Sequence, residues 1–136
     1  MKWILLAALA ACMPPKTGET LSESIRAYND NVRWERYDVA AVHLPEAQRS
    51  QRLDEWDQRT HDLRITEYDI IRVDQKGPRQ AHVQVKLSWY RESEGTLHET
   101  SAMQTWERRG KDWLMVDEAR FRGTEMPGLP EPLLKD

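Results

Sequence analysis

Hydrophobic positions change their spacing along the chain at about residue 62. In the first helical stretch they recur every three or four positions and form one stripe: Leu21, Ile25, Tyr28 and Val32. This spacing predicts an amphipathic helix. Thr20 and Glu23 have the spacing of a capping box, so we expect the helix to begin there and to continue to about Tyr37.

A second helix is expected from Pro45 to Arg59. Proline favours the first helical turn, and Glu46 is favourable near the positive end of a helix. The segment is strongly polar, and its narrow apolar stripe consists of Ala47, Leu53 and Trp56. The pattern therefore indicates a surface helix with a thin contact face.

Beyond residue 62 the period of the pattern is close to two, which is typical of strands with one buried face. We expect four strands, over residues 63–73, 81–90, 96–108 and 113–121. Short turns containing glycine join them, which indicates an antiparallel meander. Helices followed by strands predict an α+β fold, with N-terminal helices packed on one face of a curved four-stranded antiparallel sheet.

The first residues, MKWILLAALAACMPP, differ from the rest of the chain. Lys2 precedes an apolar run from Trp3 to Ala10, which is far shorter than the roughly 20 residues that a helix needs to cross a bilayer. The run has the features of a secretory signal peptide. It ends in Leu-Ala-Ala-Cys, with the only cysteine of the chain at position 12. These four residues resemble the lipobox of bacterial lipoproteins.

The lipobox resemblance implies that residues 1–11 are removed and that Cys12 carries the lipid. The protein would then be anchored in the bacterial cell envelope. An aspartate directly after the cysteine commonly retains such proteins at the inner membrane. This position is Met13 here, which favours the outer membrane, facing the periplasm. An ordinary signal peptide with an incidental cysteine is the alternative. Residues 12–20 would be the lipidated cysteine and a short linker, 21–121 the folded domain, and 122–136 a proline-rich tail, loose or strapped to the surface.

Composition and charge exclude some functions. The formal net charge of −3 would oppose a phosphate backbone, which argues against nucleic acid as a partner. A single cysteine cannot form an internal disulfide. The four histidines lack metal-site spacing, so no metal or cofactor is expected. His82 and His98 lie on adjacent expected strands and could be cross-strand neighbours, although solvated surface positions are the simpler interpretation.

Three segments carry a family resemblance: residues 25–42, the hairpin Trp106–Trp113 and the run Leu114–Asp117. They resemble the nuclear transport factor 2-like superfamily. The resemblance covers most of the chain beyond the leader and implies a cone-shaped domain in which a curved antiparallel sheet wraps around an N-terminal helix. Its motifs are patterns of shape, so they indicate a fold far more than a function.

Enzymes of that superfamily work inside the cone. The resemblance places Tyr28 at the position of a tyrosine that helps to form the oxyanion hole of ketosteroid isomerases. The catalytic base of those enzymes has no matching residue, although Asp69 and Asp117 lie on expected strands. No catalytic residue is therefore assigned, and a plain core role for Tyr28 is the alternative.

Large aromatic residues come from the helices and from three strands, and some of them could line the cone. The candidate pocket is formed by Tyr28, Trp56, Tyr68, Trp89 and Trp106. Trp34 and Tyr90 belong to the same aromatic set, and some members could instead form an exposed recognition patch. Ordinary core packing is the competing interpretation.

The sequence therefore favours a membrane-anchored envelope lipoprotein whose non-catalytic domain binds a protein partner or a small apolar ligand. The first alternative is a cavity enzyme of the ketosteroid isomerase or dehydratase kind, using Tyr28 and a strand carboxylate. The second is a structural subunit whose outer sheet face pairs with a second copy of the chain.

Overall fold

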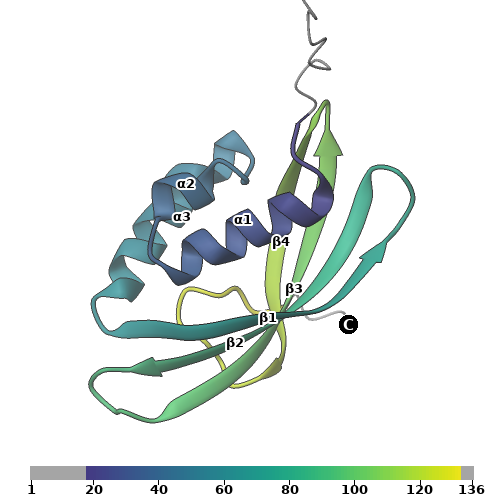
Figure 1. Cartoon of the computed structure of the whole chain (residues 1–136). Helices are drawn as coiled ribbons and strands as arrows, with labels where there is room; N and C mark the ends of the chain where they lie inside the picture. Colours follow the sequence, from purple (N-terminus) through teal and green to yellow (C-terminus); the bar gives the residue numbers. More distant parts are fainter. Residues whose placement is uncertain (1–17, 133–136) are drawn as a thin grey trace, which may run out of the picture.

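A computed structural model describes residues 18–132, which form three helices and one four-stranded sheet (Figure 1). The elements are α1 (Leu21–Arg33), α2 (Tyr37–Ala41), α3 (Glu46–Thr60), β1 (Leu63–Gln75), β2 (Gln80–Arg91), β3 (Leu97–Arg109) and β4 (Asp112–Gly123). All strand pairs are antiparallel, in the order β1-β2-β3-β4. The α+β meander expected from the sequence is confirmed. Residues 1–17, which include the expected leader and Cys12, and residues 133–136 lie outside the described residues.

Helix α1 begins at the expected capping box. The hydroxyl of Thr20 accepts a hydrogen bond from the backbone N–H of Glu23 at 3.2 Å, and the backbone N–H of Thr20 donates to the Glu23 carboxylate at 3.4 Å. These two bonds satisfy N–H groups that have no partner inside the helix. They fix the first turn of α1, whose side chains line the candidate site described below.

The expected continuation of this helix to Tyr37 is wrong, because α1 ends at Arg33. Glu35 adopts a positive φ of 60°, and the backbone N–H of Arg36 donates to the carbonyl of Asn31 at 2.8 Å. This geometry is a Schellman C-cap, which here uses a glutamate at a position usually taken by glycine. Because no glycine marks the stop, the periodicity alone could not place it.

The helices cover the concave face of the sheet, and α1 lies across it (Figure 1). Ile25 and Tyr28 from α1 and Trp56 from α3 are buried in a common core with inward-facing strand residues. Those strand residues are Ala81, Val83, Val85, Leu87, Trp89, Ala102, Trp106, Trp113 and Met115. Burial of such apolar side chains is the main contribution to the stability of a domain of this size.

The outer face of the two central strands is largely polar. Along β2 and β3 the half-buried outward positions are held by His82, Gln84, Lys86, Ser101 and Thr105. The register pairs His82 with Thr105 and His98 with Trp89, so the two histidines are not cross-strand neighbours. The alternation of β2 predicted which residues face outward, but register depends on the following turn.

Residues 124–132, which we call the strap, run back from the end of β4 toward the helical layer (Figure 1, yellow). Met126 and Leu129 are only 1% and 7% exposed and belong to the hydrophobic core. The backbone N–H of Arg120 donates to the carbonyl of Pro130 at 2.8 Å. The tail is therefore strapped to the domain over its described part, and the folded unit continues past the boundary expected at residue 121.

Gly123 makes the turn from β4 into the strap. Its φ is +85°, and a Cβ added there would lie 2.5 Å from the carbonyl oxygen of Glu99. Gly95 also has a positive φ, of +72°, but a Cβ there would meet nothing within 4 Å. The two glycines thus share a backbone conformation and differ in steric surroundings.

We expect Gly123→Ala to lower the free energy of unfolding by about 3 kcal/mol and Gly95→Ala by about 1 kcal/mol. Both variants carry the cost of a left-handed alanine, and only the first adds a clash with backbone. Urea unfolding followed by tryptophan fluorescence measures both values. Equal losses would show that the strap turn tolerates a side chain.

Candidate functional site

The aromatic residues proposed to line a pocket pack mainly against one another. Tyr28 lies 5.9 Å from Trp106 and 6.1 Å from Trp56, measured between ring centroids. Trp89 donates a hydrogen bond to Thr100 at 2.8 Å, and Tyr68 packs half-buried against the core. Three members of the predicted set therefore meet at the centre of the cone, where their rings fill space.

The remaining space beside Tyr28 has a volume of about 10 Å³. It is lined by residues of α1, α3 and the sheet, and Leu129 of the strap is part of its wall. A volume of that size holds about one water molecule. The interior of the cone is thus closed to a ligand while the strap is in place.

A buried polar cluster lies at this closed interior, and Glu118 is its centre. One carboxylate oxygen of Glu118 accepts from the Gln104 side chain at 2.8 Å, and the other accepts from Arg52 at 3.2 Å and from the Tyr28 hydroxyl at 3.4 Å. Gln104 also donates to the Asn29 side chain at 2.9 Å. The cluster therefore joins α1, α3, β3 and β4 through buried charged and polar groups.

The carboxylate beside Tyr28 is Glu118, which the sequence did not single out; Asp117 is exposed. Trp113 and Met115 face inward, so simple alternation would turn Asp117 inward too. A register shift between Thr105 and Trp106 of β3 adds one residue to β4 at Val116. This β-bulge reverses the alternation and brings Glu118 into the core.

The electrostatics of the cluster keep Tyr28 protonated and Arg52 charged. Burial, and then the negative charge of Glu118, raise the pKa of Tyr28 well above its ordinary value. Tyr28 therefore keeps its proton and donates it in a hydrogen bond. The pKa of Arg52 is raised, because the charges around it, Glu118 foremost, outweigh the effect of its burial. The Glu118 carboxylate is thus held in an ion pair with Arg52 at 3.2 Å.

Loss of one member of the buried ion pair should be costly. We expect Arg52→Met to lower the free energy of unfolding by about 3 to 5 kcal/mol, because it removes the ion-pair partner of the buried Glu118 carboxylate. The double variant Arg52→Met/Glu118→Gln should recover much of that loss. Chemical unfolding at neutral pH measures both.

Arg109→Met serves as the control for this pair. Arg109 bonds to Glu107 at 3.1 Å in an exposed ion pair, where loss of the charge should change stability very little. A double variant no more stable than Arg52→Met alone would mean that packing of the arginine stem, and not the unpaired charge, causes the loss.

An open groove lies between the first turns of α1 and the hairpin of β1 and β2. It has a volume of about 840 Å³, within the range of small-molecule sites. Its apolar wall consists of Leu21, Ile25, Ile70, Val73, Pro78 and Trp113. We call it the helix–hairpin groove. No residue of the predicted aromatic set lines it. The groove forms where two segments about 50 positions apart in sequence, residues 20–26 and 70–78, approach each other, and local sequence patterns do not show this approach.

Two cationic side chains line the same groove. Arg26 comes from the exposed side of α1, and Arg108 comes from the end of β3. Guanidinium groups bind carboxylates and phosphates through paired hydrogen bonds. The groove therefore combines an apolar wall with groups suited to an anionic head, as an amphiphilic ligand requires.

A second, more polar depression of about 530 Å³ lies beside the start of α1. The His43 ring is buried there and bonds to the carboxylate of Glu19 at 3.1 Å, while its Nδ1 atom has no hydrogen-bond partner. Glu19 also accepts from the Ser24 hydroxyl at 3.3 Å. These bonds fasten the entering chain to the domain. Over residues 18–132, no group of three metal-ligating side chains comes together.

Comparison with known proteins shows the fold. No family model matches the chain, and no curated protein does. The crystal structure of a ketosteroid isomerase-like protein from Erwinia carotovora atroseptica matches 74% of this chain and 93% of its own, with a TM-score of 0.63 and 9% identity. The fold is nuclear transport factor 2-like.

A second solved structure has a similar fold. It is the solution structure of a SEC-C motif containing protein from Rhodopseudomonas palustris, which matches over 73% of this chain and 77% of its own, with a TM-score of 0.62 and 11% identity. Similarity at such identity shows the fold and not the activity. Within the described residues, none of the helices has the length and apolar character needed to cross a bilayer.

Proposed function

We propose that this chain is a lipid-anchored protein of the bacterial envelope, and that its domain binds a small, largely apolar ligand in the helix–hairpin groove. The observation that carries the proposal is the contrast between a closed interior and an open groove. The cone holds space for about one water molecule, whereas the groove measures about 840 Å³. Binding thus requires no rearrangement of the core.

The cavity enzyme is the less well supported alternative. Its one favourable observation is the contact between the Tyr28 hydroxyl and the Glu118 carboxylate at 3.4 Å. Catalysis there would require the strap to leave, taking Met126 and Leu129 out of the core. It would also require Glu118 to give up its ion pair with Arg52. A binding role needs neither step.

The ligand class follows from the groove. Its apolar wall would contact the hydrocarbon or aromatic part of a ligand, and Arg26 and Arg108 would bind an anionic group of that ligand. A long-chain carboxylate or a related amphiphile has this chemistry. The anilinonaphthalene sulfonate dye has it too, and its fluorescence rises when it leaves water, so it serves as a probe.

Val73 provides the test of the groove. Val73 is 47% exposed and lines the groove, whereas Ile71 on the same strand is 51% exposed and does not line it. Val73→Asp should weaken dye binding at least tenfold, because it places a charge in the apolar wall. Ile71→Asp adds the same charge and should leave the affinity nearly unchanged. Equal effects of the two substitutions would show that the dye binds elsewhere.

Cys12 provides the test of the anchor. In a bacterial host, the mature protein should fractionate with membranes and have the mass of a chain that begins at residue 12 with acyl groups attached. Cys12→Ser should make the protein extractable from membranes by a high-salt wash, because lipidation supplies membrane affinity that salt does not screen. A free thiol on the membrane-bound protein would rule out lipid attachment.

A further inference from the structure

Two hairpin turns lie side by side at one end of the sheet. The backbone N–H of Arg108, at the end of β3, donates to the carbonyl of Arg79, in the turn between β1 and β2, at 2.8 Å. Between them lies a depression of about 300 Å³, lined by Pro78, Arg79, Arg108 and Gly110. The two arginines thus flank one shallow, open site.

These turns concentrate cations in an otherwise acidic protein. Arg79, Arg108 and Lys111 are all exposed, and among the described residues no carboxylate lies within 4 Å of their charged nitrogens. We call these three residues the basic end. Two further cations there, Lys76 and Arg109, are paired with Asp74 and Glu107. Two exposed carboxylates, Asp112 and Glu19, lie at the same end but do not pair with these three cations, so the cations are available to an external anion.

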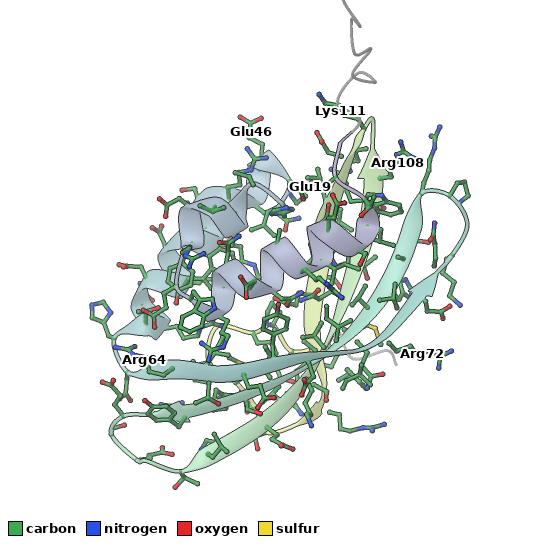
Figure 2. All side chains as sticks on the ribbon, viewed as in Figure 1. Glu19, Glu46, Arg64, Arg72, Arg108 and Lys111 are labelled. Carbon is green, nitrogen blue, oxygen red and sulfur yellow. The ribbon has the colours of Figure 1, made fainter. Side chains whose placement is uncertain are left out.

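The chain enters the domain at the same place. Gly18 lies directly against the turn, because a Cβ added to it would be 2.1 Å from the carbonyl oxygen of Lys111. The Glu19 bonds to His43 and Ser24 hold the next residue in position. Figure 2 shows Glu19, Arg108 and Lys111 at this end of the molecule, and Arg72 away from it.

We propose that the basic end binds the surface of an anionic phospholipid bilayer and orients the domain on it. Cys12 is six positions before Gly18, and six extended residues span at most about 20 Å. An anchor at Cys12 would therefore keep Arg79, Arg108 and Lys111 close to the headgroups, where basic side chains are attracted to anionic lipid. This orientation rests on the proposed lipid attachment at Cys12, whereas the charge of the basic end does not depend on that attachment.

The test uses the chain from residue 12 onward with Cys12→Ser, so that no acyl group contributes. Every core residue of the described structure lies between Ile25 and Leu129, so this chain keeps the whole core. Co-sedimentation is measured with vesicles of phosphatidylcholine alone and of phosphatidylcholine mixed with phosphatidylglycerol. We expect binding to the mixed vesicles only, and weaker binding at higher salt.

The decisive variant is Arg79→Gln/Lys111→Gln, which spares the groove residue Arg108. Each lost charge should weaken vesicle binding about fivefold, so the double variant should bind about 25-fold more weakly. The control Arg36→Gln/Arg72→Gln removes two exposed charges elsewhere and should change binding little. Equal losses in the two double variants, or no preference for anionic vesicles, would overturn the proposal.

Inorganic phosphate distinguishes a bilayer surface from a site for a free anion. Sodium phosphate should release the protein from mixed vesicles no better than sodium chloride of equal ionic strength, since a surface acts through many headgroups. Selective release by phosphate would indicate a single-anion site and would overturn the surface proposal. Because the protein carries no lipid here, this result is independent of whether Cys12 is acylated and of dye binding in the groove.

Discussion

The buried ion pair between Arg52 and Glu118 is the interaction on which the closed architecture depends. It connects α3 to β4, and the other nitrogen of Arg52 donates to the carbonyl of Gly128 in the strap at 3.4 Å. Two buried charges are stable in a core only when each satisfies the other and further hydrogen bonds complete the set. Tyr28 and Gln104 complete it for Glu118. Helices, sheet and strap are thus fixed around one carboxylate.

This arrangement encloses the carboxylate and the tyrosine that lie at the centre of the cone. A carboxylate beside a tyrosine inside such a cone could be read as a catalytic pair, but here the surrounding groups neutralise it and the strap encloses it. The accessible features lie instead at the other end of α1, where the groove and the basic end meet around Arg108. The open space in the described residues is therefore at the surface and not in the core.

The sequence predicted the secondary structure well because the periodicity changed clearly near residue 62 and the turns contained glycine. It missed the end of α1, where Glu35 takes a glycine position, and it missed Glu118, which a bulge turns inward. The groove could not be predicted from local patterns, because Leu21 and Val73 approach only in the folded chain. Local signals specify elements, whereas bulges and long-range contacts decide which side chains meet.

The fastening of Gly18 and Glu19 to the domain has a consequence for how the groove would meet its ligand. With the proposed anchor at Cys12, encounters with membrane molecules would become events within one assembly, for which effective concentrations reach the millimolar range, on the order of 1 mM. Even a shallow groove with modest intrinsic affinity would then be substantially occupied. For such a protein, affinity measured in free solution would understate occupancy at the bilayer.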